Sequence, residues 1–250
     1  EKNHLRRREA QLQMVETVSR ALQEDRFALI EAPTGTGKTF AYLVPAVLWA
    51  HSQGEPVLIS TYTRLLQDQM AGDLDRLRRY LGMDFRHQVL KGMSNYLCLR
   101  RAEAVYAQTD PETMDDEERF AWLVLLTWLS ATHEGLLDEL SYWALSTFPA
   151  LAWLCESLRA EQGECSRQHC PVWEVCFHHR AYERALRAQV VVTNHALLLS
   201  KEWEATGLPF ARVVIDEAHN LEDAATSAAT DEVSSGSVAY LVNRLLDHRS

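Results

Sequence analysis

Residues 32–39, with the sequence APTGTGKT, carry the residue types of a loop that binds the phosphates of a nucleotide. Gly35 and Gly37 let the backbone turn so that its N–H groups face phosphate oxygens. Lys38 supplies a charge for the β- and γ-phosphates, and the Thr39 hydroxyl can ligate Mg²⁺. The strict pattern has glycine where this chain has Ala32. The interpretation therefore holds only if the backbone at residue 32 does not have a positive φ. The residues expected at the ATP and Mg²⁺ site are Thr34, Gly35, Thr36, Gly37, Lys38 and Thr39.

A second set of reactive residues, DEAH at residues 216–219, follows the apolar stretch 213–215. The Asp216 carboxylate can hold Mg²⁺ through water, and Glu217 can polarise the water that attacks the γ-phosphate. His219 can couple this site to a part of the protein that moves. An acidic pair after a strand also often begins a helix, but beside a phosphate loop it indicates catalysis by Lys38, Asp216 and Glu217.

All five cysteines lie between residues 98 and 176, and in a cytoplasmic protein such clustering favours a metal site over disulfides. Cys165, Cys170 and Cys176 are closely spaced, and Cys98 provides a distant fourth thiolate. Cys155 follows an apolar helical run, which favours a buried free thiol. Four thiolates suit Zn²⁺ or an iron–sulfur cluster, and the spacing favours the cluster because structural zinc usually has tighter Cys-x2-Cys pairs. Alternative zinc ligands are His169, His178 and His179.

Strands and helices must position these residues, and the apolar periodicity predicts where they lie. An amphipathic helix with Leu12, Val18 and Leu22 on one face precedes the phosphate loop, and Gln11 near its start could meet an adenine edge. Residues 98–176 lack the apolar pattern of strands, which predicts a helical insertion in an α/β fold. We predict strands at residues 27–30, 57–60, 88–90, 190–193 and 213–215. We predict helices at residues 40–50, with a kink at Pro45, at 117–130 and at 149–159. A further long helix should follow the strand 57–60 and end at about residue 80.

Candidate contacts with the phosphates of a ligand follow from position and charge. Thr61, Thr63 and Arg64 come after the strand 57–60, where open α/β sheets place ligand contacts, although a helix N-cap made by either threonine is an alternative. Tyr96 or Trp173 could stack on bases, or could belong to the core. The candidate basic surface consists of Arg100, Arg101, Arg167, Arg180 and Arg184.

Composition bounds these interpretations. The chain has 250 residues, 47% hydrophobic and 24% charged, which is typical of a globular protein. Its net charge of −10 argues against unspecific nucleic-acid binding by the whole chain, but the charge is unevenly distributed. The longest apolar run is too short for a membrane span and no apolar signal segment begins the chain, so we expect a cytoplasmic protein. Because the first residue is Glu1, we expect a fragment.

Taken together, APTGTGKT, DEAH, KGMSNYLC at 91–98, VVTNHALLL at 191–199 and the cysteine spacing resemble the iron–sulfur superfamily 2 DNA helicases, in particular the DinG/YoaA branch related to the XPD helicases. The resemblance implies an ATP-dependent motor that moves 5′ to 3′ on single-stranded DNA in repair or replication. It also implies a [4Fe-4S] cluster. By the same resemblance, Gln11 contacts adenine, the DNA backbone is met by Thr61, Thr63 and Arg64, and the cluster ligands are Cys98, Cys165, Cys170 and Cys176.

The implied architecture is a RecA-like parallel-sheet motor domain, at residues 1–92 and 181–233, interrupted by a helical four-cysteine domain at 93–180. Residues 234–250 would begin a further helical domain. A second motor domain would be missing, so we expect nucleotide and DNA binding without unwinding. We expect a monomeric motor acting on single-stranded or forked DNA, with a possible repair or replication partner and no membrane. The alternatives are a zinc-bearing P-loop ATPase with another remodelling role and a non-motor fragment that docks DNA or a partner.

Overall fold

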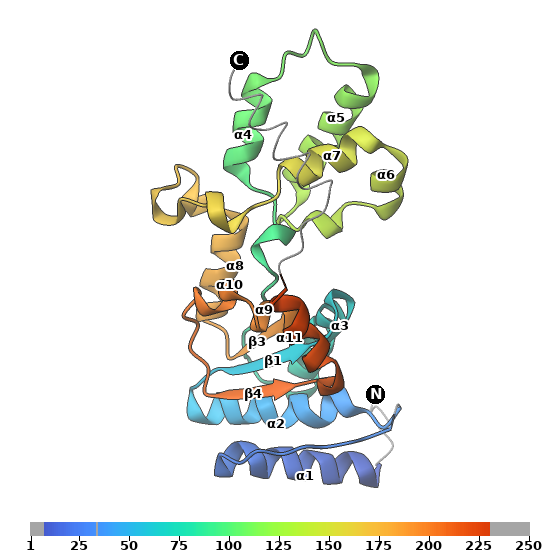
Figure 1. Ribbon diagram of the computed structural model, residues 1–250. Helices are drawn as coiled ribbons and strands as arrows, with labels where there is room; N and C mark the ends of the chain where they lie inside the picture. Colours follow the sequence, from blue (N-terminus) through green and yellow to red (C-terminus); the bar gives the residue numbers. More distant parts are fainter. Residues whose placement is uncertain (1–7, 34, 231–250) are drawn as a thin grey trace.

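The computed structural model describes residues 8–33 and 35–230, and its centre is a parallel four-stranded sheet in the order β2-β3-β1-β4 (Figure 1). The strands are β1 (Val57–Thr61), β2 (His87–Val89), β3 (Val190–Asn194) and β4 (Arg212–Ile215). Every residue of β1 is buried, as expected for the apolar central strand of a parallel sheet. Strands 57–60, 88–90, 190–193 and 213–215 were predicted within one residue at each end. Thr34 and the predicted helical start at 234–250 lie outside the described residues.

Three helices precede or connect the first two strands: α1 (Glu9–Glu24), α2 (Lys38–Gln53) and α3 (Arg64–Leu81). They share one hydrophobic core with the sheet, to which Leu22, Leu43 and Leu74 contribute. α2 continues through Pro45 as one helix. Figure 1 shows α1 and α2 as successive layers beneath the sheet.

The predicted helical insertion forms a second lobe, at the top of Figure 1. α5 begins with a capping box between Asp115 and Glu118, and α7 begins at Pro149, a favoured residue in a first helical turn. The core of this lobe also contains Leu58 and Val191 of the sheet, so the lobe and the sheet are packed together. Its helices are α4 (Leu99–Gln108), α5 (Asp116–Ala131), α6 (Tyr142–Thr147) and α7 (Pro149–Ser157), and the chain then returns through α8 (Phe177–Leu186).

Four short elements complete the described fold around β3 and β4. The helices α9 (His195–Leu198) and α10 (Lys201–Glu204) follow β3, while a 3₁₀ turn (Ala218–Asn220) and α11 (Leu221–Ala228) follow β4. In the described part of the chain, no helix is long and apolar enough to cross a membrane.

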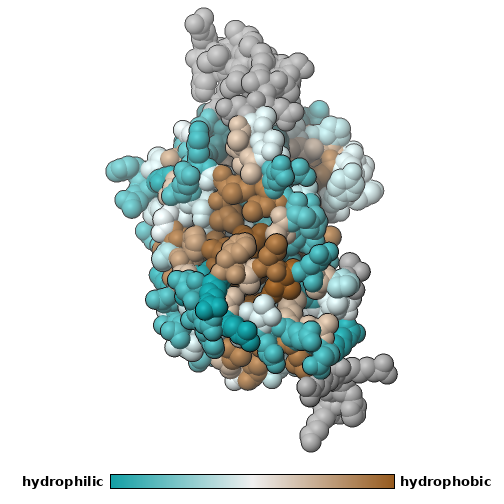
Figure 2. All heavy atoms as spheres, turned by 60° about the horizontal axis from the view of Figure 1, so that its bottom comes forward, coloured by the Kyte–Doolittle hydropathy of each residue, from teal (hydrophilic) through white to brown (hydrophobic). Residues whose placement is uncertain are grey.

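The strand predicted at residues 27–30 is absent from the described sheet, and this prediction was wrong. Phe27 and Leu29 are 93% and 84% exposed, and the segment leads from the end of α1 back to the phosphate loop without pairing. Among the described residues β4 pairs only with β1, so no described strand covers the outer edge of β4. Figure 2, with the bottom of Figure 1 turned forward, shows a broad apolar area. The apolar pattern suits a buried strand, but a strand also needs a paired neighbour, which local sequence does not supply.

Candidate functional site

The phosphate loop has the backbone that its glycines predict. Gly35 and Gly37 have φ values of 79° and 84°, in the left-handed region that favours glycine. Ala32 is not among the described residues with positive φ, so alanine fits where the strict pattern has glycine. α2 starts at Lys38, directly after the loop, which directs the positive end of the helix at the loop. The loop is therefore shaped to bind an anion.

Lys38 and Glu217 are 179 residues apart in the sequence and lie in contact. Lys38 Nζ is 3.3 Å from Glu217 Oε1, and both side chains are partly buried. Lys38 stands at the start of α2 and Glu217 follows β4, so the contact depends on the packing of α2 against the sheet. The term nucleotide half-site is used below for residues 35–39 and 216–219, which this contact joins.

Asp216, next to Glu217 in the nucleotide half-site, is partly buried. Burial raises the pKa of the Asp216 carboxyl, the neighbouring Tyr42 hydroxyl opposes this shift, and the Glu217 carboxylate adds to it. Burial also raises the pKa of Tyr42, and the Asp216 charge raises it further. The ionised Asp216 carboxylate is thus held in surroundings that disfavour its charge, and a bound cation would relieve that cost. The role of Tyr42 was missed, although Thr39 three residues earlier on the same helix face was a usable signal.

His219 is exposed at the rim of the nucleotide half-site. Its Nδ1 atom is 3.5 Å from Glu217 Oε2, while its Nε2 atom is 3.0 Å from Asn220 Nδ2. The Glu217 carboxylate therefore lies between Lys38 and His219. The Glu217 backbone has a φ of 53°, which is uncommon for a residue with a side chain.

The start of α1 is attached to the phosphate loop. Gln11 Nε2 donates to the Gly37 carbonyl at 3.0 Å, and the Arg8 guanidinium donates to the Gly35 carbonyl. A Cβ atom on Gly37 would lie only 2.4 Å from Gln11 Nε2. Gln11 thus lies on the loop next to the nucleotide half-site. In the loop itself, Thr36 Oγ1 donates to the Pro33 carbonyl at 2.8 Å.

The residues after β1 divide into buried and exposed ones. The Thr61 side chain is completely buried, with no hydrogen-bond partner in the described part of the chain, so it does not reach the surface. Thr63 caps α3 by accepting from the Leu66 N–H at 3.2 Å, which confirms the N-cap alternative. Arg64 is exposed and donates to Asn95 Oδ1 at 2.8 Å. Thr63 and Arg64 are therefore the members of this group at the surface.

Four of the five cysteines line one cavity of about 540 Å³. Cys155 lies apart in α7, buried as predicted, and burial raises the pKa of its thiol to about 11. Among the described residues, no three His, Cys, Asp or Glu side chains stand close enough together to hold a single metal ion. The cavity-lining cysteines are Cys98, Cys165, Cys170 and Cys176.

Residues 161–176, called the cysteine segment below, pack poorly. The structure describes all of them, and none is buried. Three short 3₁₀ turns make up most of the segment, with bounds Gln162–Glu164, Arg167–His169 and Trp173–Val175. The Trp173 ring stacks on His179 at a centroid distance of 3.8 Å. Tyr96, the other candidate for base stacking, is buried in the core.

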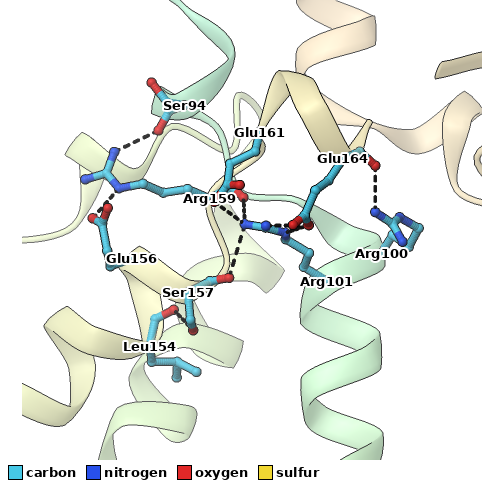
Figure 3. A network of polar contacts seen from close by, with 9 residues as sticks. All are labelled: Ser94, Arg100, Arg101, Leu154, Glu156, Ser157, Arg159, Glu161 and Glu164. Carbon is cyan, nitrogen blue, oxygen red and sulfur yellow. Dashed lines mark hydrogen bonds and ion pairs between the residues drawn. The ribbon is translucent and has the colours of Figure 1, made fainter. Parts of the chain in front are cut away.

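Arg100 and Arg101 are tied to the cysteine segment. Arg101 is only 10% exposed in its side chain, and its guanidinium lies 2.5 Å from Glu164 and 2.9 Å from Glu161 (Figure 3). It also donates to the Arg159 carbonyl at 2.7 Å, while Arg100 donates to the Glu164 carbonyl at 3.0 Å. These contacts neutralise Arg101 within the protein. Arg167 and Arg180 are exposed, whereas Arg184 is engaged by Glu134 and Gln88.

Comparison with known proteins identifies the family. Residues 8–140, a little over half of the chain, match the DEAD/DEAH box helicase family. The chain is 36% identical to the ATP-dependent helicase DinG of Mycobacterium tuberculosis over 96% of its own length and 39% of the relative. It is also 36% identical to the ATP-dependent DNA helicase YoaA of Haemophilus influenzae, over 88% of the chain and 34% of the relative. A Bacillus subtilis relative named 3'-5' exonuclease DinG is likewise 36% identical, with 23% of its length covered.

These matches agree with the paired glycine loop and DEAH residues, although the chain spans well under half the length of the relatives described. The chain belongs to the DEAD/DEAH box helicase family and is of the DinG/YoaA type.

Proposed function

We propose that this chain carries the ATP-binding part of an ATP-dependent DNA helicase of the cytoplasm. The observation that carries the proposal is the 3.3 Å contact between Lys38 and Glu217, which joins the phosphate loop to the DEAH residues. Because the chain covers at most 39% of the relatives described, we assign strand separation to a longer protein. The described part of the chain would bind nucleotide and single-stranded DNA.

Each residue of the nucleotide half-site has a distinct task in this proposal. Lys38 exchanges its contact with Glu217 for the β- and γ-phosphate oxygens, which frees the Glu217 carboxylate to orient the attacking water. Asp216 and Thr39 would hold Mg²⁺, whose charge would favour the ionised form of the buried Asp216. Gln11 contacts the adenine from its position on the loop. His219, which lies next to Glu217, couples the hydrolysis site to a part of the protein that moves.

ATP hydrolysis in the presence of single-stranded DNA tests this assignment. Lys38→Ala should lower kcat/KM by roughly 100-fold or more, because a charge aimed at the transferred phosphate is lost. Lys201→Ala is a matched control, since Lys201 is exposed on α10 away from the loop. Equal activity of the Lys38→Ala variant and the wild type would refute the proposal.

We also propose that Cys98, Cys165, Cys170 and Cys176 hold a [4Fe-4S] cluster. Their chemistry suits such a group, and they line one cavity while Cys155 does not. A zinc ion bonds sulfur at about 2.3 Å, so its ligands must crowd around one point, whereas a cluster accepts more widely spaced thiolates. Ordering the cysteine segment costs conformational entropy that its exposed side chains cannot offset. When bound, the cluster would cross-link these four positions and add a one-electron redox centre.

Iron and acid-labile sulfide, measured on anaerobically purified protein, test the cluster. The wild type should contain both and Cys165→Ser should lose both. Cys155→Ala should keep them, because Cys155 lies outside the cavity. Zinc without sulfide in the anaerobic protein would overturn the cluster and favour a zinc-bearing ATPase.

For DNA, we propose 5′ to 3′ movement on single-stranded or forked DNA in repair or replication, by a monomeric motor. Support for the contact surface comes from the exposure of Thr63, Arg64, Arg167 and Arg180, while the burial of Thr61 and the ion pairs of Arg101 argue for structural roles. Replacing Arg167 and Arg180 by alanine should weaken binding and reduce its salt dependence, because fewer counterions are released. A salt-insensitive affinity of the wild type would exclude this surface.

A further inference from the structure

His195 is the first residue of α9 and belongs to the VVTNHALLL motif, yet the assignments above give it no task. Its side chain is 0% exposed. Its Nδ1 atom lies 2.7 Å from the Ser60 hydroxyl of β1, which is also completely buried. A buried histidine and serine in hydrogen-bond contact fix the orientation of the ring, because turning the ring would leave both groups unpaired.

Ser60 connects this ring to the DEAH residues. β1 lies between β3 and β4, with Ser60 opposite Thr193 on one side and Ile215 on the other. The Asp216 N–H donates to the Ser60 carbonyl at 2.8 Å. The Ser60 hydroxyl is therefore hydrogen-bonded to His195, which follows β3, and the Ser60 carbonyl to Asp216, which follows β4. Ser60 thus connects the ends of β1, β3 and β4.

The other nitrogen of the ring faces the same turn. His195 Nε2 is buried and has no hydrogen-bond partner in the described part of the chain. The backbone of Asp216 and Glu217 is close enough to oppose the lowering of the pKa of His195 that burial causes. An N–H donor at Nε2 therefore faces backbone groups that it can bind after a small adjustment of the turn, as catalytic hydrogen bonds often tighten when substrate binds.

The turn needs such support. Glu217 has a φ of 53°, a left-handed conformation that is strained for a residue with a side chain. Conformations of this kind persist at functional sites only where the surrounding structure holds them. The Asn220 N–H donates to the Glu217 carbonyl at 3.0 Å, and His195 is completely buried.

We propose that His195 is a positioning residue for ATP hydrolysis: Nδ1 accepts from the Ser60 hydroxyl, and Nε2–H holds the backbone of Asp216 and Glu217 so that the Glu217 carboxylate meets the attacking water. The inference rests on the proposed ATP hydrolysis. It assigns His195 no contact with ATP. Loss of the Nε2 donor should therefore lower kcat and leave the KM for ATP nearly unchanged.

Two amide substitutions separate the two ring nitrogens. His195→Gln keeps an N–H donor near the position of Nε2, whereas His195→Asn reaches only the Ser60 side. We expect His195→Asn to lower kcat by roughly tenfold or more, with KM changed by less than about twofold, and His195→Gln to recover most of kcat. Thr193→Val is the matched control, because the Thr193 hydroxyl is equally buried at the end of β3 and has no described hydrogen-bond partner.

Thermal unfolding of the full-length variants keeps the test specific. A purely structural role predicts that His195→Asn and His195→Gln lose kcat in proportion to their loss of melting temperature, and that result would overturn the proposal. Unchanged kcat in His195→Asn, beside Lys38-dependent activity of the wild type, would overturn this inference alone.

An NMR readout covers the case in which the wild type hydrolyses no ATP, so that the proposed function itself fails. The ¹⁵N shifts of the His195 ring should then still show a proton on Nε2. The amide signals of Asp216 and Glu217 should move in His195→Asn and not in Thr193→Val. A proton on Nδ1, or unmoved amide signals, would refute the positioning role.

Discussion

The nucleotide half-site and the cysteine segment are built in opposite ways. The first rests on the ends of α2 and β4, and its charges are paired within the protein, as Lys38 with Glu217. The second consists of short 3₁₀ turns in which no side chain is buried, although four thiols converge on one cavity. One site is formed by the core before any ligand arrives, whereas the other has the reactive groups without a core of its own.

The difference teaches that ligand dependence is unevenly distributed along this chain. Because hydrophobic burial and hydrogen bonds hold the nucleotide half-site, it should keep its shape without nucleotide. The cysteine segment is fastened at its edges, by Arg101 to Glu164 and Glu161 and by Phe177 at the start of α8. If the four thiolates bind the proposed cluster, the middle of the segment is expected to depend on that cluster for its structure.

The largest effect should follow removal of the metal group. In iron-loaded protein, Cys165→Ser or an iron chelator should raise the rate of trypsin cleavage after Arg167 by roughly 100-fold, because metal binding energy that ordered the segment is lost. Cleavage after Arg79 in α3 is the internal control and should not change. Nucleotide affinity should stay within about twofold, and a parallel loss of it would show that the two sites do not fold separately.

The packed edge of the cysteine segment can be tested at Gly135. A Cβ atom there would lie 2.1 Å from the Phe177 ring, and the residue has a φ of +66°. Gly135→Ala should therefore lower the free energy of unfolding by about 3 kcal/mol, through strain and overpacking. Gly163→Ala, which meets no atom within 4 Å, should have little effect. Equal urea midpoints for the two variants would show that Phe177 moves aside easily.

A smaller effect is expected at the phosphate loop. Gly37→Ala forces a side chain into a left-handed backbone and against Gln11, and should weaken Mg·ATP binding by roughly tenfold. Gly54→Ala places the same change at the other end of α2, where φ is +70° and nothing lies within 4 Å. It should cost stability but no affinity. Titration calorimetry with a non-hydrolysable ATP analogue measures the affinity of the Gly37→Ala and Gly54→Ala variants. Similar affinities of the two variants would contradict a preformed loop.

The smallest effect concerns the stability cost of Asp216. Burial raises its pKa, so its contribution to stability is present at acidic pH and is lost as the pH rises through the pKa of the folded state. Asp216→Asn should therefore stabilise the protein without nucleotide at neutral pH, by on the order of 1 kcal/mol, with less gain at acidic pH. Asp223→Asn, on exposed α11, is the control. If the melting temperatures of Asp216→Asn and the wild type differ by the same amount at acidic and at neutral pH, the predicted pH dependence of the Asp216 contribution is wrong.

The sequence was most reliable where a local pattern has a local cause. Glycine at residues 35 and 37 predicts positive φ, and both have it. The apolar strands after residues 56 and 189 predict a buried parallel sheet, and these strands pair in register. Cys155 was separated from the other cysteines by its apolar surroundings, and it is buried.

The sequence was least reliable where the outcome depends on a neighbour far along the chain. Phe27 and Leu29 have the residue types of a strand, yet no described strand pairs with them. Arg101 has the charge of a DNA contact, but Glu161 and Glu164, about 60 residues later, neutralise it. Thr61 follows a strand as a ligand contact would, but packing from both faces of the sheet buries it.

The chemistry available to this protein could be predicted from the sequence alone: a phosphate loop, a DEAH pair with the strand that leads into it, and four clustered thiols with a fifth apart. Only the tertiary structure decided which of these groups meet. It joined Lys38 to Glu217, buried His195 against Ser60, and turned Arg101 inward. The physical reason is that backbone conformation and apolar periodicity are encoded over a few residues, whereas burial and charge pairing depend on surfaces that come together only when the chain packs.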